Sequence, residues 1–232
     1  MALIGTAGWA IPAPYRDRFP AAGTQLERYA ARLPAVEINS SFYRPHRCKT
    51  YARWAASVPD NFRFSVKLPR TITQDKRLRD CDAEMARFCG EVAGLDGKLG
   101  MVLVQLPPSL PFDAGVARDF FSRLCDTVPA ACEPRHASWF APEADALLRD
   151  LHVPRVAADP PRAPGDGVPG GWTGTAYWRL HGSPKIYYSD YPEETLQAMA
   201  PKLRAKDWCI FDNTAAFAAL GNALNLAALR GA

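Results

Sequence analysis

The chain has 232 residues, of which 48% are hydrophobic and 22% are charged, and its formal net charge is +4. These fractions resemble those of average globular proteins, which excludes a disordered chain and a coiled coil, and the length suits one large domain. No stretch approaches the roughly 18 uncharged apolar residues that cross a bilayer, and residues 1–12 lack the basic start of a signal peptide. We therefore expect a single domain over residues 1–232 that stays in the cytoplasm as a monomer without a membrane contact.

Short apolar runs typical of β-strands alternate along the chain with stretches of helical periodicity. The predicted strands are Leu3–Thr6, Ala35–Ile38, Phe62–Val66, Met101–Leu106, Ala130–Glu133, Arg155–Ala158, Ala176–Leu180 and Trp208–Phe211. The predicted helices are Leu26–Arg32, Tyr51–Ala56, Ala83–Leu95, Ala114–Cys125, Glu143–Leu151, Glu193–Leu203 and Ala215–Leu229.

This alternation predicts an α/β fold in which a parallel sheet is covered by helices. Eight strand–helix units suit a closed (β/α)8 TIM-type barrel, although 232 residues is slightly below its usual length. An open, doubly wound sheet is the alternative, but the first strand–helix junction, Gly5–Trp9, does not match a Rossmann phosphate loop. The Pro- and Gly-rich stretch 159–174 is expected to be a mobile loop over one end of the barrel.

Nearly every predicted strand ends in polar or ionisable residues, and residues of one parity on a barrel strand point inward. Converging charges lose their hydration and must be paired, so a purely structural barrel does not need them. We therefore predict a ligand site at the carboxyl ends of the strands. The ionisable and amide candidates are Glu37, Asn39, Lys67, Arg70, Gln105, Glu133, Arg135, His136, Asp159, Arg179, His181, Asp212 and Asn213.

Aromatic residues lie among these groups in the predicted loops, which suits an anionic ligand with a flat or sugar-like body. Trp9, Tyr43 and Trp139 are the aromatic candidates for substrate contacts. Residues 41–79 hold ten Lys or Arg residues against two acidic ones, a local charge of +8 that favours anions.

Several ordered motifs resemble those of the YecE-like family, which is also called domain of unknown function 72. The motifs are Gly5–Trp9, Val36–Arg44, Trp54, Phe62–Pro69, Leu103–Pro108, Glu133–Trp139, Tyr177–Gly182 and Phe211–Asn213. They extend from Gly5 to about Asn222, nearly the whole chain. The resemblance implies a TIM-type barrel and a cytoplasmic bacterial or archaeal protein, and it implies no established activity. One position departs from the family pattern: Gln74 stands where the family commonly has His, which would remove that imidazole from any proton transfer.

The first functional hypothesis is an enzyme, a hydrolase, isomerase or lyase, that acts on a phosphorylated or otherwise anionic small molecule. In this hypothesis Lys67, Arg70, Arg135 and Arg179 hold the anion, because arginine can bind it through two hydrogen bonds. Glu133 or Asp212 acts as the base, and His136 or His181 acts as the acid.

Two alternatives remain open at this point. The first is a nucleic-acid-binding or phosphodiester-processing protein, in which Glu37, Glu133, His136, Asp159, His181 and Asp212 would assemble a divalent metal site. The converging cations disfavour such a metal, the six scattered cysteines lack zinc-site spacing, and we therefore expect no cofactor and no bound metal. The second alternative is a ligand sensor without catalytic activity.

Overall fold

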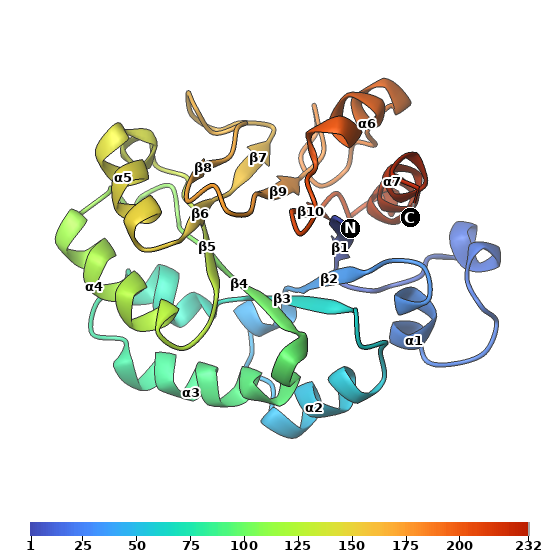
Figure 1. The fold of residues 1–232 in the computed structure, drawn as a ribbon, viewed down its shortest axis with the longest axis horizontal. Helices are drawn as coiled ribbons and strands as arrows, with labels where there is room; N and C mark the ends of the chain where they lie inside the picture. The colour runs from blue at the N-terminus through green and yellow to red at the C-terminus, as the bar shows by residue number, and fades with distance from the viewer. Residues whose placement is uncertain (232) are drawn as a thin grey trace.

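One sheet of ten strands, in the order β7-β9-β10-β1-β2-β3-β4-β5-β6-β8, forms the centre of the computed structural model, which describes residues 1–231 (Figure 1). Neighbouring strands are parallel except for the β6–β8 pair. The strands are β1 (Leu3–Ala7), β2 (Ala35–Ile38), β3 (Arg63–Lys67), β4 (Leu99–Gln105), β5 (Ala130–Glu133), β6 (Pro154–Arg155), β7 (Ala157–Asp159), β8 (Gly170–Gly171), β9 (Tyr177–Leu180) and β10 (Trp208–Phe211).

The sheet closes into a barrel because β6 and β7 are two halves of one extended segment. β6 pairs with β5, β7 pairs with β9, and only Val156 separates the two. The backbone N–H of Val156 donates a hydrogen bond to the carbonyl oxygen of Cys132 at 2.8 Å, which continues the pairing with β5. The parallel part of the strand order, from β7 to β6, therefore begins and ends at this segment, as a mostly parallel barrel requires.

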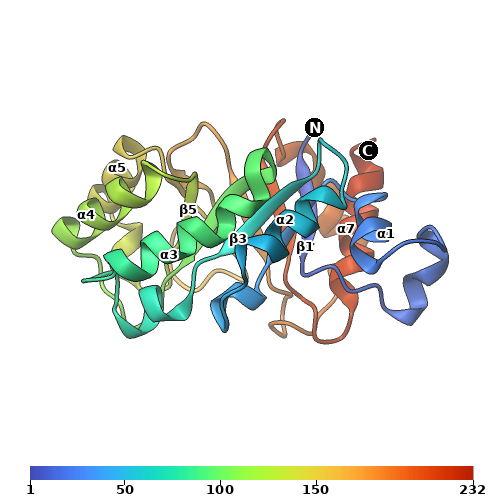
Figure 2. The ribbon, with the colours of Figure 1, turned by 90° about the horizontal axis from the view of Figure 1, so that it is seen from below.

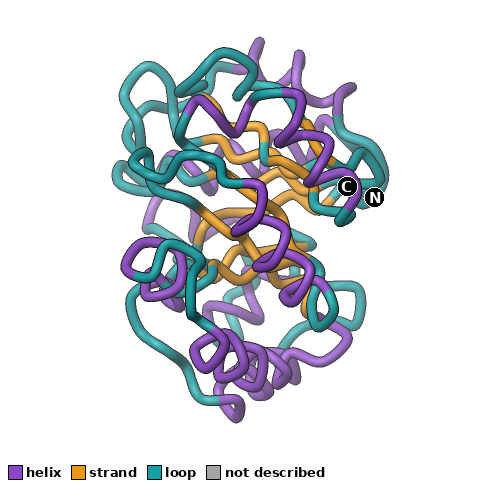
Figure 3. Tube along the Cα trace, turned by 90° about the vertical axis from the view of Figure 1, so that its left-hand side faces the viewer, coloured by secondary structure: helices purple, strands orange, loops and turns teal. Residues whose placement is uncertain are grey.

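Helices surround the strands on the outside of the barrel (Figure 3). The first strand and the last helix pack together, so the two ends of the chain lie side by side in both Figure 1 and Figure 2. The helices are α1 (Gln25–Ala30), α2 (Cys48–Ala56), α3 (Asp82–Val92), α4 (Ala114–Cys125), α5 (Pro142–Asp150), α6 (Glu193–Met199) and α7 (Ala218–Leu229). Among the described residues, none of these helices combines the length and apolar character of a membrane-spanning segment.

Alternate residues of each strand supply two separate apolar cores. On β4, Met101 and Leu103 point into the barrel, whereas Val102 and Val104 pack against the helices. The barrel interior is filled by Ala35, Met101, Leu103, Ala131, Val156, Tyr177, Trp208 and Ile210. The inward parity expected for barrel strands is thus observed, and the next inward residues along the strands are the polar ones described below.

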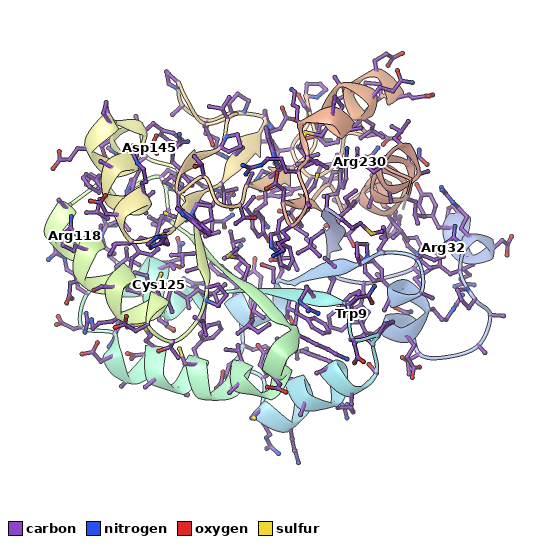
Figure 4. The ribbon with its side chains drawn as sticks, viewed as in Figure 1. Trp9, Arg32, Arg118, Cys125, Asp145 and Arg230 are labelled. Carbon is purple, nitrogen blue, oxygen red and sulfur yellow. The ribbon has the colours of Figure 1, made fainter. Side chains whose placement is uncertain are left out.

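Each predicted strand and helix has an observed counterpart, and α4 has the predicted bounds. The clearest difference is the sixth predicted strand, which is divided at Val156. The segment 159–174 forms no helix. The buried guanidinium group of Arg155 holds this segment against the barrel by donating hydrogen bonds to the carbonyl oxygens of Gly165 and Val168. Arg155 also pairs with Asp145 on α5 at 2.7 Å, a residue labelled in Figure 4.

Trp208 fills the barrel interior only because β4 carries a glycine opposite its ring. A Cβ atom at Gly100 would lie 2.6 Å from Cζ2 of Trp208, whereas a Cβ atom at Gly90 on α3 would meet nothing within 4 Å. We expect Gly100→Ala to destabilise the fold by about 1–3 kcal/mol through overpacking. The same substitution at Gly90 should stabilise the fold by up to ~1 kcal/mol, because alanine is the better helix former. Urea unfolding of both variants checks this pair, and equal effects at the two positions would contradict the packing assigned to Trp208.

Candidate functional site

The guanidinium group of Arg179, on β9, is fully buried and binds three carboxylates. Its Nε and Nη2 atoms donate hydrogen bonds to Glu37 at 3.0 and 2.6 Å, Nη1 donates to Glu133 at 2.9 Å, and Nη2 also donates to Asp212 at 3.1 Å. Glu37 lies on β2, Glu133 ends β5 and Asp212 follows β10. The carboxyl ends of four strands are therefore joined through one side chain.

We call the polar group around this side chain the Arg179 cluster. It consists of Glu37, Lys67, Gln105, Glu133, Arg135, Tyr177, Arg179, His181 and Asp212.

His181 lies between two of the carboxylates. Its Nδ1 atom is 3.0 Å from Asp212 and its Nε2 atom is 3.0 Å from Glu133. A carboxylate only accepts hydrogen bonds, so both ring nitrogens must carry a proton for both contacts to form. Burial alone would lower the pKa of His181, but the hydrogen bonds to Asp212 and Glu133 raise this pKa above its usual value. Both contacts therefore favour the imidazolium form of the ring, which adds a positive charge to the cluster.

Glu133 accepts the most hydrogen bonds in the cluster. Its donors are Arg179, His181, Gln105 at 2.8 Å and Arg135 at 3.3 Å. Burial would raise the pKa of Glu133, but Arg179 and His181 hold it well below the usual value. The pKa of Asp212 is likewise lowered, because Arg179 and His181 outweigh the effect of burial. Both groups are ionised at neutral pH and are poor proton acceptors.

Tyr177, which also contacts Ser65, holds the Glu37 carboxylate from the side of the barrel interior. The hydroxyl group of Tyr177 donates a hydrogen bond to Glu37 at 2.7 Å and lies 2.8 Å from Oγ of Ser65. The Tyr177 ring stacks on Trp208 with a centroid distance of 5.6 Å. Glu37 is therefore fixed by the interior core of the barrel, which positions Arg179 in turn.

Lys67 is the last residue of β3 and has a different environment. Its Nζ atom lies 4.2 Å from the ring centroid of Phe42, and within residues 1–231 it forms no ion pair with a carboxylate. Burial and the charge of Arg179 lower the pKa of Lys67 to about 8, although Glu133, Glu37 and Asp212 act in the opposite direction. Ser41 fixes the geometry, because its hydroxyl group donates a hydrogen bond to the carbonyl oxygen of Lys67 at 2.6 Å.

The cluster contains one more positive than negative charge when Lys67 is protonated. Glu37, Glu133 and Asp212 face four cations, which are Arg179, His181, Lys67 and Arg135. Lys67 has no ion pair in the described chain, and the buried Nε of Arg135 has no hydrogen-bond partner there. Lys67, Asp212 and Gln105 keep 8%, 8% and 9% of their surface exposed, whereas Arg179 and His181 have 0%. The accessible side of the cluster therefore presents the unpaired Lys67 beside Gln105 and Asp212.

Eight of the predicted site residues converge in the cluster: Glu37, Lys67, Gln105, Glu133, Arg135, Arg179, His181 and Asp212. Asp159 instead accepts a hydrogen bond from the Tyr191 hydroxyl at 2.6 Å.

The other predicted aromatic and histidine residues have other partners. His136 begins a short 3₁₀ helix, Ala137–Phe140, and its Nδ1 atom accepts a hydrogen bond from the backbone N–H of Ser138. Trp139 is buried in the core outside the barrel, where its Nε1 atom donates to the carbonyl oxygen of Leu110. Trp9, labelled in Figure 4, packs edge-on against Trp54 with a centroid distance of 5.1 Å. These three side chains lie outside the Arg179 cluster, and their contacts with a ligand stay a prediction.

Three more predicted residues likewise serve the loops. Arg70 forms an exposed pair with Asp75 at 3.3 Å, and Tyr43 is 75% exposed. Asn213 is fully buried and donates hydrogen bonds to Ser189 and Asn222.

Asn39 directly follows β2, and Gln74 lies in the short helical turn Thr71–Asp75 after β3. Oδ1 of Asn39 has no partner in the described chain. Nε2 of Gln74 donates to the carbonyl oxygen of Gln105 at 3.3 Å, so the residue that replaces the family's usual His touches the backbone of a cluster residue.

Sequence reasoning missed Ser65 and Tyr177 as parts of the site. Both could have been found by parity, because Tyr177 lies two residues before Arg179 and Ser65 lies two residues before Lys67 on the same strands.

Within residues 1–231, no group of three His, Cys, Asp or Glu side chains has the arrangement of a metal site. The basic segment 41–79 is partly neutralised by the fold. Arg70, Lys76 and Arg79 pair with Asp75, Glu84 and Asp113 respectively.

Comparison with known proteins identifies similar chains along the whole length. The family model described as "Protein of unknown function DUF72" matches residues 3–232. The UPF0759 protein YecE of Escherichia coli K12 is 32% identical over 165 residues, which cover 68% of this chain and 59% of that protein. The UPF0759 protein YunF of Bacillus subtilis 168 is 30% identical over 152 residues, which cover 61% and 53%. The aligned part of this chain thus spans less than two thirds of either relative.

Two solved structures share the fold. A DUF72 family protein from Enterococcus faecalis V583 superimposes with a TM-score of 0.82 at 20% identity, covering 100% of this chain and 96% of that one. A DUF72 family protein from Thermotoga maritima MSB8 gives a TM-score of 0.78 at 24% identity, with both chains covered completely. The predicted mostly parallel barrel and the family resemblance are confirmed.

The Arg179 cluster predicts a large and pH-dependent effect of removing its central cation. We expect Arg179→Met to destabilise the fold by about 3–5 kcal/mol at pH 7, because three carboxylates lose their buried partner. Without Arg179 the pKa values of Glu133 and Asp212 in the folded state should exceed their unfolded values, so protonation stabilises the variant and its deficit shrinks as the pH falls.

Urea unfolding at pH 7 and pH 5 measures this effect. Arg123→Met is the matched control, because Arg123 pairs with Asp82 and Asp119 at the surface and its loss should cost at most ~1 kcal/mol. A deficit at Arg179 that is as small as the control, or that does not change with pH, would contradict the cluster.

Proposed function

This chain belongs to the DUF72 family, and we propose that it is an enzyme that acts on an anionic, phosphate-bearing small molecule at the mouth of the barrel. The observation that carries the proposal is the net positive charge of the Arg179 cluster, together with the place of Lys67 at its accessible side. Nζ of Lys67 is a donor without an ion pair in the described chain, and Arg135, whose side chain is 13% exposed, makes one long contact of 3.3 Å to Glu133. Leaving such donors unpaired is unfavourable, and an anion that accepts their hydrogen bonds removes this cost.

The residues have distinct roles in this proposal. Lys67 and Arg135 bind the anion, and Gln105 lies at the same exposed edge. Arg179 is fully engaged with carboxylates, so it positions the cluster and does not bind the ligand. His181 is the proton reservoir, because Asp212 and Glu133 keep it protonated.

Asp212, whose side chain is 12% exposed, links His181 to the accessible side of the cluster. Glu133 is a weak base here, since four donors already hold it in its ionised form. Hydrolysis, isomerisation and lyase chemistry are all compatible with an anion site beside this proton source.

Anion binding can be measured directly by thermal shift and calorimetry. We expect phosphate and sugar phosphates to raise the melting temperature, and Lys67→Met to weaken their binding about ten-fold or more, because a charged hydrogen bond is lost. Arg70→Met is the control, since Arg70 pairs with Asp75 in an exposed loop, and its affinity should be unchanged.

A short single-stranded oligonucleotide belongs in the same panel. If the oligonucleotide binds and small phosphates do not, the nucleic-acid alternative replaces this proposal. If no anion stabilises the folded protein, the proposal is wrong.

A further inference from the structure

We propose that Lys67 is a nucleophile that forms an imine with the carbonyl group of an anionic aldehyde or ketone. This inference rests on the proposed function, because it names the reactive group and the substrate class of the same anion site.

The surroundings of Lys67 favour the neutral amine to an unusual degree. The side chain is more than nine-tenths buried and forms no ion pair within residues 1–231. Burial removes hydration from the ammonium group, and the Phe42 ring at 4.2 Å compensates only in part, so the neutral form gains in population. Only the neutral amine has the lone pair that attacks a carbonyl carbon.

Charged groups from four other strands face Lys67 and determine this balance. Arg179 on β9 disfavours the ammonium form, whereas Glu133 on β5, Glu37 on β2 and Asp212 after β10 favour it. The three carboxylates are only partly effective, because Arg179 and His181 already bind them. The pKa of Lys67 is accordingly lowered to about 8 and lies close to physiological pH.

The reaction is balanced without a further reactant. The Lys67 nitrogen forms a bond to the carbonyl carbon, the π electron pair moves to oxygen, and a proton moves from nitrogen to this oxygen. The hydroxyl group then leaves as water with one proton from the solvent, and a protonated imine remains. This imine keeps the positive charge at the position of the ammonium group, so a phosphate or carboxylate bound to Arg135 stabilises the product as well.

The chain offers an internal control in Lys185. Its Nζ atom also lies 4.2 Å from an aromatic centroid, that of Tyr188, but the residue is exposed and lies outside the Arg179 cluster. Both lysines therefore contact an aromatic ring, and only Lys67 combines this contact with burial and the cluster charges.

Reductive trapping tests the proposal. The intact protein is treated with borohydride in the presence of glyoxylate, pyruvate, glyceraldehyde 3-phosphate or uncharged acetaldehyde, and the modified lysines are identified by peptide mass spectrometry. We expect Lys67 to be modified on the order of ten-fold or more faster than Lys185 at pH 7, because a lower pKa leaves more neutral amine. We also expect faster modification by the anionic carbonyl compounds than by acetaldehyde.

Lys67→Arg separates this inference from the proposed function. This variant keeps the positive charge and should still be stabilised by phosphate, while the adduct at position 67 disappears. Phosphate binding without any adduct on wild-type Lys67, or equal modification of Lys67 and Lys185, would overturn the imine and leave the anion site standing. An adduct on Lys67 that forms equally fast with acetaldehyde would support the nucleophile and contradict the anionic substrate.

Discussion

The structure at the carboxyl ends of the barrel strands depends on the burial of one guanidinium group, that of Arg179, among three carboxylates. Transferring such charges out of water is costly, and attraction compensates only when nearly every donor and acceptor is satisfied. The cluster meets this condition for Arg179 through Glu37, Glu133 and Asp212. Each carboxylate then needs its own support, which comes from Tyr177, Gln105 and His181.

The network has a consequence for the chemistry of its edge. Arg179 and His181 together balance two of the three carboxylate charges, and Arg135 makes only a 3.3 Å contact with Glu133. Lys67 is then left without an ion pair in the described chain, and the cost of the buried charges is explained if they prepare Lys67 for reaction. A barrel filled with apolar residues to its rim would be simpler to fold, so we interpret the cluster as a feature retained for function.

Much of this arrangement could be predicted from the sequence, because the period of two along a strand determines which residues point inward. This period places Glu133 and Arg135 on the same side of the chain, and it does the same for Arg179 and His181. Parity could not identify residues beyond the strand ends, where the chain leaves the extended conformation. Trp139 therefore looked like a ligand contact, although the 3₁₀ helix Ala137–Phe140 turns it into the outer core.

Partner choice was also beyond the sequence. Nothing in the local pattern shows that Arg179 binds Glu37, which lies 142 residues earlier in the chain, or that His181 binds Glu133. The assignment depends on contacts between strands far apart in the chain.

The titration of Lys67 tests the central claim most directly. An NMR titration of protein labelled at its lysine side chains, with Lys67→Arg used to assign the resonance, gives the pKa of this amine. We expect a pKa of about 8 for Lys67, and we expect this pKa to rise when phosphate is added, because an anion stabilises the ammonium form. A pKa near the ordinary value of about 10.4 that does not respond to phosphate would contradict both the environment and the role assigned to Lys67.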